Sequence, residues 1–160
     1  MRATDVVVVG AGHAGCEAAV AAVGMGATVV LVTLDRETVA EMPCNPAIGG
    51  IGKGHLVCEV DALGGLQGWV TDRAGLQFRV LNASRGPAVW GPRAQCDKRV
   101  YSRLMRHVVE RTPGLTLLEG EVEGLVVDEA GVRGVRLEGG QRGSTSDSRC
   151  DPGSPRAEQG

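Results

Sequence analysis

The sequence predicts an α/β fold built on a parallel sheet, and three observations support this. Four consecutive valines, Val6–Val9, form a β-branched run typical of a strand buried on both faces of such a sheet. An alanine-rich stretch, residues 14–25, follows at once and predicts a helix. A second aliphatic run, residues 28–33, completes a strand–helix–strand unit. At 160 residues one domain is expected, so we predict a Rossmann-like domain with a parallel sheet and a β-hairpin.

The turn between the first strand and its helix has G-x-G-x-x-G spacing. Gly10 permits the tight turn, Gly12 lets a pyrophosphate approach the backbone, and Gly15 lets the helix pack closely on the strand. The free N–H groups at the start of the helix favour an anion. The turn therefore predicts a dinucleotide site; the alternative is a tight turn without a ligand. The candidate residues are Gly10, Ala11, Gly12, His13, Ala14 and Gly15.

The end of the second strand is where dinucleotide-binding folds often place an acid that binds the ribose. Thr33 occupies this place and Asp35 follows two residues later. Thr33 is the candidate for the ribose, while Asp35 is interpreted as an ordinary loop residue.

A glycine-rich loop extends from Met42 to His55, with two prolines and four glycines that argue against a regular element. It differs from a phosphate-binding P-loop, because Gly54 follows Lys53 where Ser or Thr is required. Cys44 lies between two prolines and is a candidate nucleophile; the alternative is a buried, unreactive thiol. The loop itself could also be an ordinary surface loop. Its candidate ligand-binding residues are Asn45, Gly49, Gly50 and Lys53.

A basic segment follows a short predicted helix, residues 56–63. Between Arg79 and Arg106 there are seven cations and one acid, although the net charge of the chain is only −2. This local excess predicts contact with ligand phosphates or an RNA backbone; the alternative is a solvated face of the helix predicted for residues 94–110. The candidates for nucleic acid are Arg85, Arg93, Lys98 and Arg99.

The remaining segments complete the predicted domain, residues 1–140. Residues 115–118 predict a third parallel strand, and residues 121–128 and 131–137 predict a hairpin. Residues 141–160 hold no aliphatic residue larger than Ala157, which predicts a disordered tail. The five cysteines include no C-x-x-C pair, which argues against a zinc ribbon. Their odd number and the lack of a signal peptide favour a cytoplasmic location. No membrane span is predicted.

Long runs of this sequence resemble one protein family. These runs are residues 10–19, 43–57, 61–65, 77–90 and 93–98. They are similar to the N-terminal part of the GidA/MnmG family, the flavoprotein subunit of the enzyme that modifies tRNA wobble uridine with a carboxymethylaminomethyl group. The resemblance covers residues 1–139, so we expect the chain to be incomplete relative to the family, with an unrelated tail.

The resemblance implies a cofactor and partners. It implies FAD, with reduced nicotinamide (NAD) and methylene-tetrahydrofolate as further reactants, tRNA as substrate, an MnmE-type GTPase partner and a homodimer. It places the FAD pyrophosphate on residues 10–15, offers backbone groups of Val122 to the adenine, and aligns Cys44 with a functional cysteine of the family. Two alternatives stay open: an inactive FAD-binding fragment, and another flavoenzyme such as a folate-dependent tRNA uridine methyltransferase. The loop at residues 43–50 argues against the methyltransferase.

Overall fold

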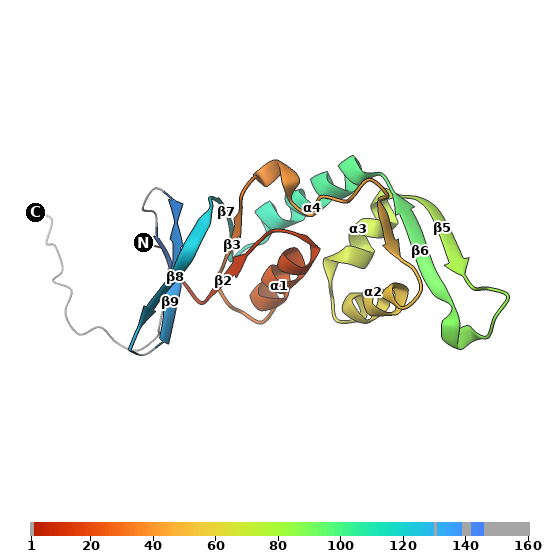
Figure 1. The fold of residues 1–160 in the computed structure, drawn as a ribbon, viewed down its shortest axis with the longest axis horizontal. Coiled ribbons are helices and arrows are strands. Elements are labelled where there is room, and N and C mark those ends of the chain that lie inside the picture. The colour runs from red at the N-terminus through yellow and green to blue at the C-terminus, as the bar shows by residue number, and fades with distance from the viewer. Residues whose placement is uncertain (1, 130, 139–141, 146–160) are drawn as a thin grey trace, which may run out of the picture.

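The computed structural model describes residues 2–129, 131–138 and 142–145. Three sheets follow one another along an elongated molecule (Figure 1). The central sheet is the predicted parallel sheet, with strands β2 (Val6–Val9), β3 (Val29–Thr33) and β7 (Leu115–Glu119) in the order β2-β3-β7. The α/β fold and the three parallel strands are therefore confirmed.

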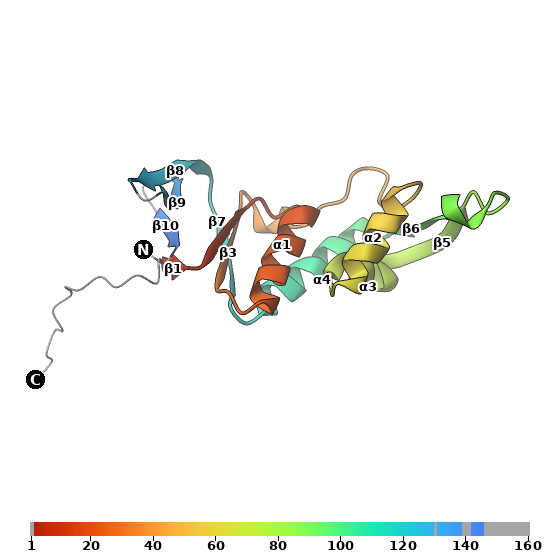
Figure 2. The same cartoon turned by 90° about the horizontal axis from the view of Figure 1, so that it is seen from below.

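The two faces of the central sheet are covered differently. Figures 1 and 2 show helices α1 (His13–Gly24) and α4 (Lys98–Arg111) on one side of β3, and strands β8 (Val122–Asp128) and β9 (Gly131–Leu137) on the other. Val29 and Leu31 accordingly pack in the core on the helix side, while Val30 and Val32 pack against the second sheet. The prediction that Val6–Val9 form a strand buried on both faces is wrong, because β2 lies at the sheet edge and Val9 is 56% exposed. The strand buried on both faces is β3.

The second sheet contains the predicted hairpin. Strands β8 (Val122–Asp128) and β9 (Gly131–Leu137) pair antiparallel, and the sheet continues through β10 (Arg142–Thr145) to β1 (Arg2–Thr4). Regular structure therefore extends beyond the predicted boundary at residue 141. Backbone pairing with β9 and β1 forms this strand without requiring aliphatic side chains. The rest of the expected tail, residues 146–160, lies outside the described residues.

The third sheet was not predicted. It is antiparallel, with β4 (Ala47–Gly49), β6 (Gly91–Cys96) and β5 (Gly75–Leu81) in the order β4-β6-β5. Helices α2 (Lys53–Ala62) and α3 (Leu66–Ala74) lie beside it, and two short 3-10 helices, η1 (Arg36–Thr38) and η2 (Pro87–Val89), complete the fold (Figure 1).

Two further predictions are corrected by this sheet. The glycine-rich loop does contain regular structure, because β4 and the start of α2 lie within residues 42–55. The helix predicted from residue 94 begins at Lys98 instead. Residues 94–96 belong to β6, and the Asp97 carboxylate accepts hydrogen bonds from the N–H groups of Arg99 and Val100, which caps the helix. Those bonds hold the pKa of Asp97 below its ordinary value, with the bond from Val100 the largest cause.

Candidate functional site

Each glycine of the turn after β2 meets a different requirement. Gly10 has φ +97° and donates its N–H to the carbonyl of Val32 at 2.8 Å. A Cβ at Gly15 would lie 1.8 Å from the carbonyl oxygen of Gly10, so only glycine fits there. A Cβ at Gly12 would meet no described atom within 4 Å, so nothing in the described chain requires glycine. The space beside Gly12 is what a ligand would need.

The first turn of α1 faces this space without a competing group. Gly12 is the N-cap, no side chain of the described residues caps the helix, and its first turn holds no acid. Hydrogen bonds hold the residue that precedes Gly12, because the carbonyl of the buried Ala11 accepts from Ala40 N and from Cys16 Sγ. Burial, and secondarily Glu17, raises the pKa of the Cys16 thiol to about 12, so this cysteine is a packing residue. Ala14 is exposed.

A pocket of about 530 Å³ connects the glycine turn to the glycine-rich loop. The predicted residues that line it are His13, Asn45, Gly49, Lys53 and Arg93. Apolar side chains complete the wall, and Gln67 of α3 also lines it. Residues far apart in the sequence therefore meet at one site.

Cys44 lies between two residues that line this pocket, Pro43 and Asn45. Its side chain is exposed, so the alternative of a buried thiol is wrong. The other described cysteines are Cys58, which is exposed, and Cys16 and Cys96, which are buried.

Other predicted residues lie outside the pocket. Thr33 ends β3, is 7% exposed and donates to the carbonyl of Asp35, while Asp35 itself caps η1 by accepting from Glu37 N. Val122 begins β8 and packs against the second core cluster. Gly50 has φ +119° and donates to the carbonyl of Pro92.

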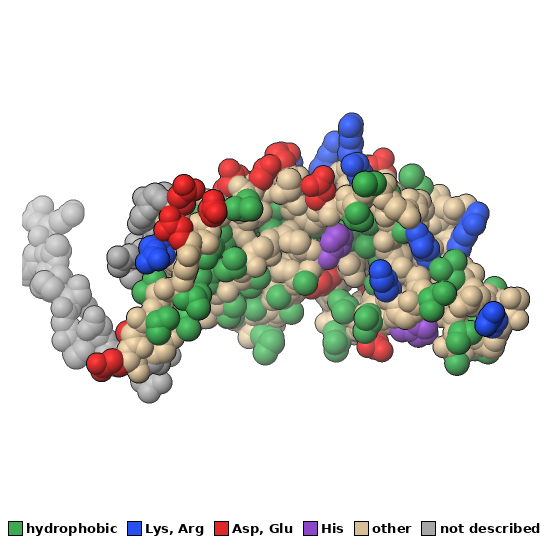
Figure 3. Space-filling model, in the orientation of Figure 1, with side chains coloured by type: hydrophobic (Ala, Val, Ile, Leu, Met, Phe, Trp, Pro, Cys, Tyr) green, Lys and Arg blue, Asp and Glu red, His purple; other side chains and the backbone are tan. Residues whose placement is uncertain are grey.

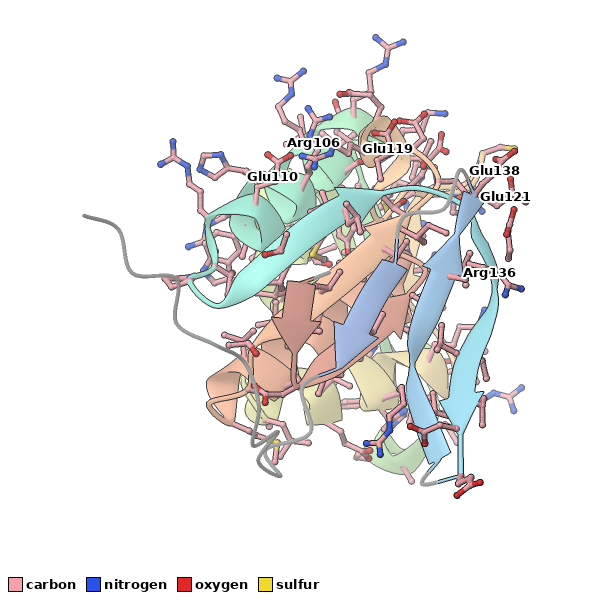
Figure 4. The ribbon with its side chains drawn as sticks, turned by 90° about the vertical axis from the view of Figure 1, so that its left-hand side faces the viewer. Arg106, Glu110, Glu119, Glu121, Arg136 and Glu138 are labelled. Atoms are coloured by element: carbon pink, nitrogen blue, oxygen red, sulfur yellow. The ribbon has the colours of Figure 1, made fainter. Side chains whose placement is uncertain are left out.

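Sequence reasoning missed an acid beside Thr33. Glu119 ends β7 and is the register partner of Thr33 across the parallel sheet. Its carboxylate lies 3.9 Å from the Arg36 guanidinium and accepts from Arg36 N at 3.3 Å. Figure 4 shows Glu119 with Glu121 and Glu138 near the same edge of the sheets. Only pairing across the sheet brings Glu119 to Thr33, so no local motif could identify it.

The four candidates for nucleic acid do not lie together. Arg93 lines the pocket described above, and Arg85 lies between β5 and β6, where its carbonyl accepts from the Trp90 indole N–H at 2.8 Å. Lys98 and Arg99 instead border a groove of about 400 Å³ along α4. Figure 3 shows the Lys and Arg side chains gathered over this helix.

The groove also includes residues that were not predicted as candidates. Its other lining residues are Glu37, Glu41, Ser102, Arg103 and Arg106. Arg106 forms an ion pair with Glu37. We call the cationic residues of this groove, Lys98, Arg99, Arg103 and Arg106, the α4 basic face.

Two negative observations apply to the described residues alone. They contain no helix long and apolar enough to cross a membrane. They also contain no group of three His, Cys, Asp or Glu side chains placed to hold a metal ion.

Comparison with known proteins assigns the chain to a family. The model of the family described as glucose inhibited division protein A matches residues 5–147, beyond the limit of residue 139 expected from the sequence runs. The chain is 54% identical over 136 residues to the tRNA uridine 5-carboxymethylaminomethyl modification enzyme MnmG of Chlamydia felis, covering 85% of this chain and 22% of that protein. The corresponding enzyme of Salinibacter ruber is 55% identical over 134 residues, covering 82% of this chain and 20% of that protein. The chain thus spans about a fifth of the length of these curated relatives.

Solved structures agree with this assignment. Aquifex aeolicus GidA matches with a TM-score of 0.87 and 46% identity, over 90% of this chain and 24% of that one. PqsL of Pseudomonas aeruginosa, a probable FAD-dependent monooxygenase, shares only the fold, with a TM-score of 0.59 and 21% identity over 90% and 41% of the two chains. By sequence and by fold, this chain belongs to the glucose inhibited division protein A family, GidA/MnmG.

Proposed function

We propose that this chain supplies the FAD-binding part of an enzyme that attaches a carboxymethylaminomethyl group to C5 of a tRNA wobble uridine. The observation that carries this proposal is the space beside Gly12, which opens at the N-terminus of α1 next to the pocket lined by His13 and Lys53. The identity to enzymes named for this modification favours it over folate-dependent methyl transfer.

The residues present fit FAD. Gly12 and the first turn of α1 would hold the pyrophosphate, because unpaired N–H groups at a helix start stabilise anions. Thr33 and backbone groups of Val122, near the carboxyl ends of the parallel strands, would hold the ribose and adenine. Asn45, Gly49, Gly50 and Lys53 would hold the flavin end. Bound FAD would supply hydride transfer.

Cys44 is the proposed nucleophile. As a thiolate, its sulfur would add to a uracil ring carbon next to C5, which makes C5 electron-rich. The thiol is exposed between two pocket-lining residues, and Lys53, which lines the same pocket, would stabilise the negative charges of the thiolate and the adduct.

The remaining assignments concern the complete protein. We propose tRNA contact through the α4 basic face together with Arg85 and Arg93. Reduced nicotinamide, methylene-tetrahydrofolate, an MnmE-type GTPase partner, a homodimer and a cytoplasmic location complete the proposal, and they rest on family membership.

Gly12→Val tests the FAD site. A branched side chain would fill the space beside the loop, so we expect loss of flavin binding with the far-ultraviolet circular dichroism unchanged. Gly24→Val is the matched control, because a Cβ there also meets no described atom within 4 Å but lies at the other end of α1. Flavin is titrated by quenching of its fluorescence. Equal affinity in wild type and Gly12→Val would contradict the assignment.

A further inference from the structure

Two neighbouring rings behind the pocket each carry a buried polar atom. Within the described chain, His13 Nε2 and the Tyr101 hydroxyl are the buried side-chain polar atoms that have no hydrogen-bond partner. Their rings are neighbours, with centroids 5.4 Å apart and planes inclined by 34°. A buried polar atom without a partner destabilises the fold, so such atoms are rare and require an explanation.

The two residues have different access to the ligand space. His13 is the first residue of α1 and lines the pocket. Since only its Nε2 is buried without a partner among the described atoms, Nδ1 is the ring nitrogen that a ligand can reach. Tyr101 of α4 is 0% exposed and lies behind His13, away from the pocket lining. The side chain of Gln67 is a second polar neighbour of its hydroxyl.

The surroundings determine which atom donates. Burial lowers the pKa of His13, and Glu17 opposes this effect. Burial raises the pKa of Tyr101, reinforced by Cys96, Glu17 and Cys16 and opposed by Gln67. The imidazole is therefore neutral and the phenol protonated at neutral pH. A phenol then donates and an unprotonated imidazole nitrogen accepts.

We propose that the Tyr101 hydroxyl donates a hydrogen bond to Nε2 of His13, after rotation of the two side chains, and thereby holds the imidazole proton on Nδ1. In a neutral imidazole one nitrogen carries the proton, and the bond made by the other nitrogen decides which. The pocket then receives a fixed N–H donor for an acceptor atom of its ligand. Tyr101 is a positioning residue, and only the identity of that ligand, FAD, rests on the proposed function.

The tautomer of His13 tests the proposal without any ligand. We would record the ¹⁵N-resolved imidazole spectrum of the full 160-residue chain, with His13 assigned by His13→Gln. The expected result is an Nδ1–H tautomer in the wild type that shifts toward Nε2–H in Tyr101→Phe. Phenylalanine keeps the packing of the ring and removes only the hydroxyl. An Nε2–H tautomer in the wild type, or an unchanged tautomer in Tyr101→Phe, would overturn the proposal.

Flavin affinity provides the second readout. Loss of one oriented hydrogen bond predicts about fivefold weaker FAD binding for Tyr101→Phe. His13→Gln should weaken binding at least as much, and the double variant no more than His13→Gln alone, since both changes remove one interaction. The control is His107→Gln, which changes an exposed histidine on α4, the helix of Tyr101, and should bind FAD as the wild type does. If the losses of FAD-binding free energy in the two single variants added up in the double variant, His13 and Tyr101 would not act through one interaction.

The outcomes distinguish the proposed FAD-binding function from the proposed hydrogen bond between Tyr101 and His13. Absence of FAD binding in the wild type contradicts the proposed function, and the tautomer measurement then decides the present inference alone. Normal FAD binding in Tyr101→Phe with an unchanged tautomer contradicts the inference while the function stands. If Tyr101→Phe does not fold, the wild-type tautomer decides, with Nδ1–H in support and Nε2–H against.

Discussion

Gly12 and Gly15 belong to one motif, yet substitutions at these two residues should differ in their effect on the stability of the fold. A methyl group at Gly15 would collide with the rigid backbone oxygen of Gly10, whereas one at Gly12 would meet open space. Gly15→Ala should therefore lower the free energy of unfolding by about 1–3 kcal/mol, the usual cost of overpacking. Gly12→Ala, whose backbone conformation alanine can adopt, should change it by less than about 0.5 kcal/mol. Urea unfolding without FAD measures both, and equal losses would contradict this distinction.

Cysteine reactivity distinguishes Cys44 from the other cysteines. We expect Cys44 to react fastest with a small alkylating agent at neutral pH and more slowly once FAD fills the pocket. Cys16 and Cys96 should react slowly, because burial removes access and raises the pKa of both thiols. Cys58 is the control for exposure alone. Mass spectrometry gives the rate for each cysteine.

Two results would contradict the role of Cys44. If Cys44 reacts no faster than Cys58, its thiolate is not activated in this chain. If FAD leaves its rate unchanged, the thiol does not lie beside the bound flavin. Cys150 lies outside the described residues.

At the scale of the elements, a side chain of α1 holds the start of α3. The Glu17 carboxylate accepts from Leu66 N at 2.9 Å and from Gln67 N at 2.6 Å, two groups that have no partner within their own helix. Glu17→Ala should therefore lower the free energy of unfolding by about 2 kcal/mol. Glu59→Ala, an exposed glutamate on α2, is the control and should have little effect. Chemical unfolding measures both, and similar values would show that the cap contributes nothing.

The α4 basic face should bind tRNA with a strong salt dependence. Neutralised phosphates release counterions, so Arg99→Ala combined with Arg103→Ala should weaken binding and reduce the slope of log affinity against log salt by about 2. Arg111→Ala combined with Arg136→Ala removes the same charge elsewhere and is the control. Filter binding across a salt series measures the slopes. Equal slopes in the two double variants would show that the face does not contact RNA.

Sequence analysis found the elements that local sequence patterns encode and missed those that depend on contacts between distant residues. The strand–helix–strand unit follows from runs that carry their own period and glycine signals, so its three elements were predicted close to their observed bounds. The strands β5 and β6 pair with each other over a basic, proline-containing stretch, and β4 is fixed by bonds such as Cys96 N to Pro46 O. Helix α3 begins at a cap from Glu17, far away in the sequence. Such causes are tertiary and leave no local pattern.

At the scale of the whole molecule, the site could be predicted only in part. The glycine turn and the glycine-rich loop were identified separately from their composition, but only the fold shows that His13 and Lys53 line one pocket. The same fold separates Arg93 from Arg99, although both belong to one basic segment of the sequence. The buried neighbours of His13 could not be predicted, because Tyr101 reaches it across the packing of α4 on α1.

Amide hydrogen exchange should reveal how stability is distributed along the molecule. Strand β3 is buried throughout and pairs on both sides, so its amides should exchange only through global unfolding. Strand β5 lies at a sheet edge with Leu76, Phe78 and Val80 exposed, so its amides should exchange through local opening and much faster. Within β10, the amides that bond to β9 or β1 should be slower than those of β5, because β10 has a neighbour on each side. Mass spectrometry of peptic fragments measures all three. If residues 142–145 exchange as fast as a free peptide, the boundary predicted at residue 141 is correct and β10 does not persist in solution.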